Sequence, residues 1–159
     1  MKNYQTRQER KGVGLRPSVV LLSIFVLCRP LFPQSAEAKF GQLTVIIDGL
    51  ENDQGKVLVA LCNSEKDFES SGKTCRLATL GIMKKQASIT LDDLPPGMYA
   101  LKAFHDENGD GELNTDFLGI PNENYGFSNN ARGTFGPPSW DDAKFMLKLP
   151  ADTVRILIE

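Results

Sequence analysis

The sequence has very little of the residue types on which most enzyme chemistry depends. It contains one histidine and three cysteines in 159 residues. Neither a G-x-S-x-G nor an H-E-x-x-H motif accompanies the histidine, His105. A lone histidine at the end of an apolar segment, without a nucleophile beside it, is typical of a hydrogen-bonded structural residue. We therefore predict a protein that is not an enzyme and has no catalytic residue.

Sustained helical periodicity is also missing after residue 38, where short apolar runs alternate with turn residues. Several runs place apolar side chains at every second position, which is typical of strands with one buried face. The predicted strands are 41–50, 56–62, 86–91, 98–105, 143–149 and 153–159. We predict an all-β fold, an antiparallel β-sandwich of about seven strands, in which the first two strands form a hairpin.

No apolar run is long enough to cross a membrane as a stable helix, which needs roughly 20 residues. The apolar run 18–28 follows a basic leader and precedes the small-residue sequence AEA at 36–38. This order is typical of a secretory signal peptide, predicted here as residues 1–38. The alternative is an uncleaved anchor. We expect a periplasmic or secreted protein with one domain, residues 39–159, and no membrane insertion after signal removal.

Positive charge is scarce outside the leader. The predicted signal peptide, residues 1–38, holds six of the 18 basic residues but only two of the 20 acidic ones. Residues 39–159 therefore contain 12 basic and 18 acidic residues. An acidic surface without a basic stripe repels phosphate backbones, so we expect no nucleic-acid partner.

Only Cys62 and Cys75 remain once the leader is removed. A pair of cysteines in an oxidising compartment is a candidate disulfide. The alternative is two unpaired thiols in one polar loop.

Between Lys102 and Arg132 there is no basic residue, yet six carboxylates occur, five of them within residues 106–116. Oxygen-bearing side chains at alternate positions, with glycine at the sixth, are the pattern of a calcium loop. Phe117 occupies the twelfth position, where a bidentate glutamate normally closes the site. We predict a bound Ca²⁺; the alternative is a turn that solvates its charges. The predicted ligands are Asp106, Asn108, Asp110, Glu112, Asn114 and Asp116.

Residues 106–142 contain no convincing strand but several large apolar side chains, which predicts one long ordered loop. Four aromatic residues set among glycine and asparagine form a candidate ligand surface for a glycan or a protein. These are Tyr125, Phe127, Phe135 and Trp140. The alternative is that they fasten the loop to the rest of the domain.

Two stretches carry a resemblance to known families. The segment ITLDDLPPGMYALKAF, residues 89–104, resembles the strand–turn–strand of transthyretin-like and collagen-adhesin B-type sandwich domains. Residues 103–145, with LTVIIDGL and GKVLVAL, closely resemble the bacterial family of domain of unknown function number 2141. This resemblance implies an exported single-domain protein and an acidic loop as a family trait at Asp106, Asn108, Asp110 and Asn114. It implies no activity.

We therefore expect a non-catalytic module with a binding or structural role in the cell envelope. The rival hypothesis is a glycan hydrolase that uses two carboxylates of the acidic loop, Glu112 and Asp116. A third hypothesis is a purely structural partner in a larger assembly.

Overall fold

The computed structural model describes residues 40–70 and 74–159, all of which belong to one compact unit of the chain, Ala36–Glu159. The predicted signal peptide, residues 1–38, lies outside the described residues, so its presence and cleavage stay predictions. Within the described part of the chain, no helix is long and apolar enough to span a membrane.

Strands dominate the described residues, which form nine strands, two short α-helices and one 3-10 helix. The strands are β1 (Gly41–Asp48), β2 (Lys56–Cys62), β3 (Arg76–Leu80), β4 (Ile82–Met83), β5 (Gln86–Leu94), β6 (Met98–Asp106), β7 (Tyr125–Phe127), β8 (Phe145–Met146) and β9 (Ala151–Leu157). The helices are α1 (Glu65–Glu69), η1 (Ser128–Asn130) and α2 (Trp140–Ala143).

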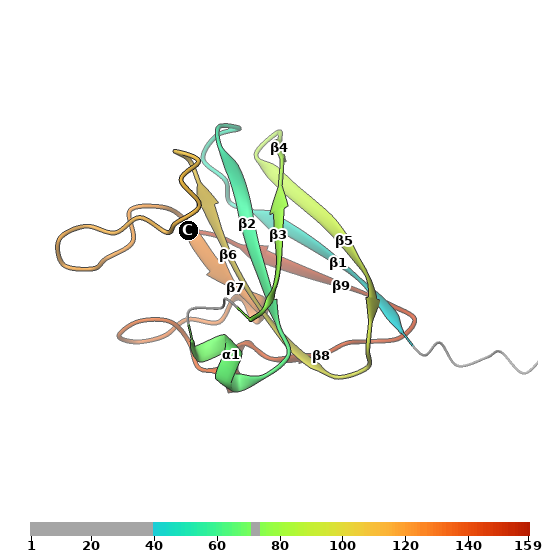
Figure 1. The fold of residues 1–159 in the computed structure, drawn as a ribbon. Helices are drawn as coiled ribbons and strands as arrows, with labels where there is room; N and C mark the ends of the chain where they lie inside the picture. Colours follow the sequence, from blue (N-terminus) through green and yellow to red (C-terminus); the bar gives the residue numbers. More distant parts are fainter. Residues whose placement is uncertain (1–39, 71–73) are drawn as a thin grey trace, which may run out of the picture. The chain divides into compact units, whose positions relative to one another are not determined.

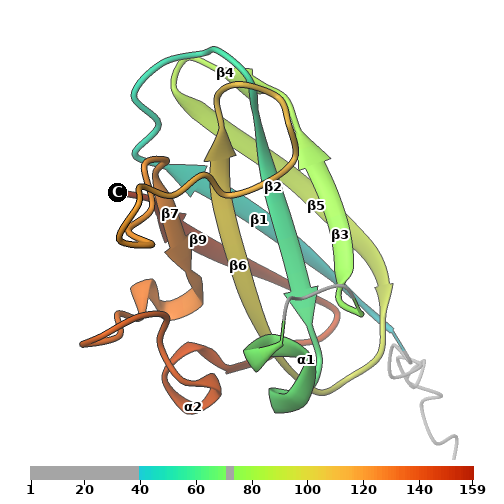
Figure 2. The same ribbon diagram turned by 60° about the vertical axis from the view of Figure 1, so that its left-hand side comes forward.

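The strands form two sheets. The first sheet has four strands in the order β4-β5-β1-β9, and the second has the order β3-β2-β6-β7 with β8 also paired to β6. Figures 1 and 2 show the second sheet lying against the first. The expectation of a β-rich fold is therefore confirmed as a two-sheet architecture.

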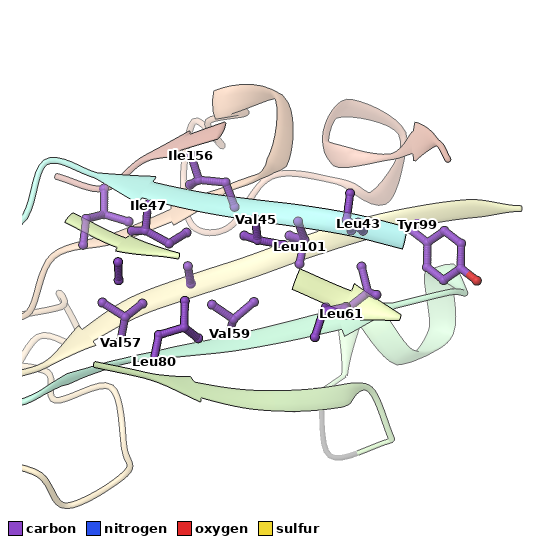
Figure 3. Close-up of a cluster of buried hydrophobic side chains, with 14 of the residues drawn as sticks. Leu43, Val45, Ile47, Val57, Val59, Leu61, Leu80, Tyr99, Leu101 and Ile156 are labelled. Carbon is purple, nitrogen blue, oxygen red and sulfur yellow. The ribbon is translucent and has the colours of Figure 1, made fainter. Parts of the chain in front are cut away.

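The hydrophobic core lies between the two sheets. Leu43 and Val45 of β1 are fully buried, and they belong to the same cluster as Val57 and Val59 of β2 in the other sheet. Figure 3 shows these side chains pointing toward one another from the facing strands. Alternation along each strand sends every second side chain into this layer, and burial of that apolar area holds the sheets together.

The predicted hairpin between the first two strands is wrong. β1 pairs with β5 and β9, whereas β2 pairs with β3 and β6, so the two strands lie in different sheets. The connection between them, residues 49–55, is longer than a tight hairpin turn and crosses from one sheet to the other. Stacked sheets lie only about 10 Å apart, which a connection of this length spans easily.

The expectation that all strands pair antiparallel is also wrong, because β9 runs parallel to β1 from Gln42↔Ala151 to Asp48↔Leu157. The strand that precedes β9 in the chain, β8, belongs to the second sheet, where it pairs with β6. It then returns at the start of β1, where the Gln42 N–H donates to the Pro150 carbonyl at 2.9 Å. A strand that begins beside the start of β1 must run in the same direction.

Strand number and extent also differ from the prediction of about seven strands. Residues 106–142, the long excursion that was predicted to lack strands, contain β7, which pairs with β6. The predicted strand 143–149 is reduced to the two residues of β8. β3 and β4 were not predicted, because neither alternates clearly between buried and exposed residues. Short edge strands are defined by their partner and carry little periodic signal of their own.

Candidate functional site

Asp106 ends β6 and begins the acidic loop, defined here as residues 106–116. Its side chain is fully buried. One carboxylate oxygen accepts the Gly109 N–H at 2.7 Å and the other accepts the Gly111 N–H at 3.0 Å. Both glycines have positive φ, near +80°, where a side chain would be strained. The carboxylate of Asp106 therefore folds the first turn of the loop.

Three further predicted ligands, Asn108, Asp110 and Asn114, form a second hydrogen-bond network next to this turn. The Asn108 amide donates to Asp110 Oδ2 and to Asn114 Oδ1, both at 2.9 Å. The Asn114 amide also donates to Asp110 Oδ2, at 3.1 Å. Asp110 accepts the Glu112 N–H as well, and these hydrogen bonds, led by the one from Glu112, lower the pKa of the Asp110 carboxyl.

Glu123 closes the acidic loop from outside it, and it was not among the predicted site residues. Its two carboxylate oxygens accept the Glu107 N–H at 3.1 Å and the Asn114 N–H at 3.0 Å. The side chain thus ties the beginning of the loop to its ninth residue. Glu123 is the sixth carboxylate of the stretch without basic residues between Lys102 and Arg132. Its place in that stretch was the one feature of the sequence that could have indicated a role in the site.

Asp116 belongs to a separate turn. Its Oδ1 accepts the Leu118 N–H at 2.8 Å and the Ile120 N–H at 2.9 Å. Phe117 at the tip of this turn is 94% exposed. Asp116 therefore organises the protruding tip of the excursion, whereas Glu112 is exposed and contributes its backbone N–H to the network of Asp110.

The structure brings four of the six predicted calcium ligands into adjoining networks: Asp106, Asn108, Asp110 and Asn114. Within residues 40–70 and 74–159, no three His, Cys, Asp or Glu side chains gather closely enough to hold a metal ion. Backbone and amide N–H groups occupy the carboxylate oxygens instead. The calcium site stays a prediction.

His105 is fully buried at the end of β6. Its Nε2 is 2.8 Å from the Gln54 carbonyl oxygen. Its Nδ1 is 3.5 Å from Glu107 Oε1, an ion pair only if the ring is protonated, and makes no hydrogen bond to the described residues. The ring packs the loop before β2 against β6.

The four predicted surface aromatics have different surroundings. Phe127 and Trp140 are buried and pack edge-on against Phe68 of α1, with ring centroids 6.0 and 5.9 Å from it. Tyr125 packs against Phe127 at 5.9 Å, whereas Phe135 is fully exposed in the loop before α2. Phe127 and Trp140 thus fasten the excursion to the sheet, and the structure does not gather all four into one platform.

The disulfide predicted between Cys62 and Cys75 is present, with 4.5 Å between the Cα atoms. It joins the end of β2 to the residue before β3 and closes the segment that carries α1. Both cysteines belong to the same buried cluster as Phe68 and Phe127. The bridge therefore holds α1 against one end of the second sheet.

A groove of about 560 Å³ lies on the outer face of the second sheet. Strand pairing places Leu58 beside Phe104 and Phe104 beside Tyr125 in one row, and Ala60 beside Lys102 in the next. Leu77 of β3 and Leu113 of the acidic loop complete the apolar lining. Figure 2 shows the loop after β6 arching beside this face.

The groove was not predicted, because the outward face of an antiparallel sheet is usually polar. A signal was nevertheless present: Leu58, Ala60 and Phe104 occupy the strand positions opposite to the core-facing ones. Recognising them as one surface required knowing which strands pair.

Comparison with known families matches residues 45–155 to a family described as uncharacterized protein conserved in bacteria (DUF2141). The chain belongs to this family. The match covers most of the described residues, from β1 to β9, including the acidic loop and the groove. Neither the curated proteins nor the solved structures contain a significant match. The DUF2141 assignment brings no activity, so function must be inferred from the groove and its surroundings.

Proposed function

We propose that this protein is an exported, non-catalytic binding module whose ligand occupies the groove on the outer face of the second sheet. The observation that carries the proposal is the open, largely apolar groove of about 560 Å³ on the outer face of the second sheet. Volumes of roughly 300–1,000 Å³ with mostly apolar walls are typical of small-ligand sites.

The walls of the groove come from elements with independent anchors. β7 supplies Tyr125 and is fastened by Phe127, which packs against Phe68. Residues 111–113 of the acidic loop supply another wall, and Asp106 and Glu123 hold that loop in place. A preformed site binds with little ordering cost, because its walls are already fixed.

Export is supported by the disulfide, since such bridges persist in oxidising compartments. We propose a periplasmic or secreted location, reached through the predicted signal peptide. The two-sheet architecture is further proposed to be a sandwich of the transthyretin-like or immunoglobulin-like type.

Calcium is proposed as a stabiliser of the acidic loop. Support comes from the side-chain oxygens of exposed Asp110 and partly buried Asn114, which the Asn108 amide now bridges. A cation at that position would replace the amide donor and offset the repulsion among the loop carboxylates. In the rival hypothesis of a glycan hydrolase, Asp116 would be one of the two reactive carboxylates. Its engagement by two backbone N–H groups weakens that hypothesis.

The groove is tested with a neutral apolar fluorophore, phenylnaphthylamine. We compare Leu77→Gln, which makes one wall polar, with Met83→Gln on β4, outside the groove; the two side chains are 67% and 73% exposed. We expect saturable binding to the unmodified protein, about tenfold weaker binding to Leu77→Gln because apolar contact area is lost, and no change for Met83→Gln.

Fluorescence titration measures the dissociation constant of the probe for each of the three proteins. Equal affinities in all three proteins, or no saturable binding at all, would remove the groove as a ligand site and the proposed function with it.

A further inference from the structure

Lys102 is the basic residue of the groove lining. It lies on β6 between Ala60 of β2 and Phe127 of β7, on the outward face of the second sheet. Its Nζ donates to the Ser70 carbonyl at 3.1 Å and lies 4.8 Å from the centre of the Phe68 ring. The ammonium group is therefore held at the α1 end of the groove.

The charge of Lys102 has no ion-pair partner in the part of the chain that the structure describes. Among the described residues, no carboxylate lies within ion-pair distance of its ammonium group. Burial against apolar side chains lowers the pKa of Lys102 below its ordinary value. One carbonyl and one ring satisfy only part of an ammonium group with three N–H donors. An anion placed there would gain a charge-assisted hydrogen bond in a partly desolvated site.

Glu112 is the acidic residue of the groove lining. Glu112 belongs to the acidic loop that starts at Asp106, four residues beyond Lys102 along β6. At about 3.4 Å per residue, this separates the start of the acidic loop from Lys102 by roughly 14 Å along the strand. Leu58, Phe104 and Tyr125 form an apolar row across the sheet, at a level of β6 between Lys102 and Asp106. Along β6 the order is therefore Lys102, the apolar row at Phe104, and Asp106, where the acidic loop begins.

From this arrangement we infer that the groove binds an anionic amphiphile: an apolar body along Leu58, Phe104 and Tyr125, with a single negative head group on the Lys102 ammonium. The head group lies at the α1 end, because the Ser70 carbonyl and the Phe68 ring hold the Lys102 ammonium group there. This inference rests on the proposed function and adds to it the charge and orientation of the ligand.

The test uses two fluorophores with the same rings, anilinonaphthalene sulfonate and phenylnaphthylamine, which differ by the sulfonate. Protein purified after expression of the full chain is compared with Lys102→Met, which keeps the apolar stem and removes the charge. Lys148→Met removes an equal charge outside the groove lining. We expect the sulfonate probe to bind the unmodified protein about tenfold more tightly than the neutral probe, as a charge-assisted contact implies.

In Lys102→Met we expect the preference for the sulfonate to be lost, so that the two probes bind with equal affinity. Circular dichroism of the variant shows that it is folded. Lys148→Met should keep the preference for the sulfonate.

Two results would overturn the inference, and they are distinguishable. If Leu77→Gln weakens both probes while Lys102→Met leaves the sulfonate preference intact, the groove binds apolar ligands but Lys102 does not select anions. If Leu77→Gln changes neither probe, the groove is not the binding site, and the proposed function fails together with the inference.

Discussion

Gly126 lies in strand β7, where the backbone conformation suits most residue types, but the surrounding atoms leave no room for a side chain. A Cβ built on it would lie 2.8 Å from the Leu157 carbonyl oxygen and 2.9 Å from Ile156 Cγ2. The neighbouring Tyr125 and Phe127 point to the opposite side, toward the groove. Glycine at this position therefore lets β7 approach β9 closely enough to support the groove wall from behind.

Gly126→Ala should destabilise the fold by about 1–3 kcal/mol, because the added methyl group overlaps backbone and core atoms. The matched variant is Gly81→Ala, whose Cβ would meet nothing within 4 Å. Chemical denaturation of both variants measures the change in unfolding free energy. Similar changes in unfolding free energy for the two variants would mean that the close approach of β7 and β9 does not contribute to stability.

Helix α1 depends on its surroundings more than on its own residues. It has five residues, with Ser64 as N-cap and Phe68 as its buried side chain. A helix this short is not stable in isolation, since nucleation is costly. The disulfide and the packing of Phe68 against Phe127 supply the missing stability and hold the Ser70 carbonyl near Lys102.

Replacing both Cys62 and Cys75 by alanine should lower the unfolding free energy by about 3 kcal/mol, the chain-entropy estimate for a loop of this size. Alanine is chosen because Cys62 is fully buried and serine would bury a hydroxyl. Urea denaturation measures the loss. The unmodified protein under reducing conditions should show a similar decrease; stability that is unaffected by either treatment would contradict a stabilising role for the bridge.

The whole described domain carries an excess of acidic residues, and the acidic loop concentrates several of them without a basic residue between Lys102 and Arg132. Hydrogen bonds from backbone and amide groups organise these carboxylates but do not cancel their charge. A divalent cation that binds only the folded loop would stabilise the folded domain through mass action.

Millimolar Ca²⁺ should therefore raise the melting temperature relative to excess chelator, and the rise should grow with Ca²⁺ concentration. Asp110→Asn should abolish most of this effect. Asp93→Asn is the matched control, because Asp93 is an exposed carboxylate whose positive φ asparagine also tolerates. Thermal unfolding followed by circular dichroism measures the shift. A melting temperature independent of Ca²⁺ would show that the loop simply solvates its charges.

Local patterns predicted the strands with a strict alternation and the residues that they bury. The predicted strand 153–159 has apolar residues at alternate positions, and one of them, Ile156, is fully buried in β9; the paired cysteines are joined as expected. β7 and β8 could not be predicted in extent, because three or two residues show no period. The role of Glu123 was hidden for a similar reason: a carboxylate seven residues beyond Asp116 carries no local mark of the N–H groups that it accepts.

Residue order alone thus established a β-rich domain, its core-facing side chains, its disulfide pair and a loop dense in carboxylates, because alternation and composition act over short distances. Strand partners, the parallel pairing of β1 with β9 and the groove beside Lys102 depended on tertiary structure. These features join residues from distant strands, and the free energy that selects one pairing comes from burying a common core. That energy belongs to the assembled sheets and to no single segment.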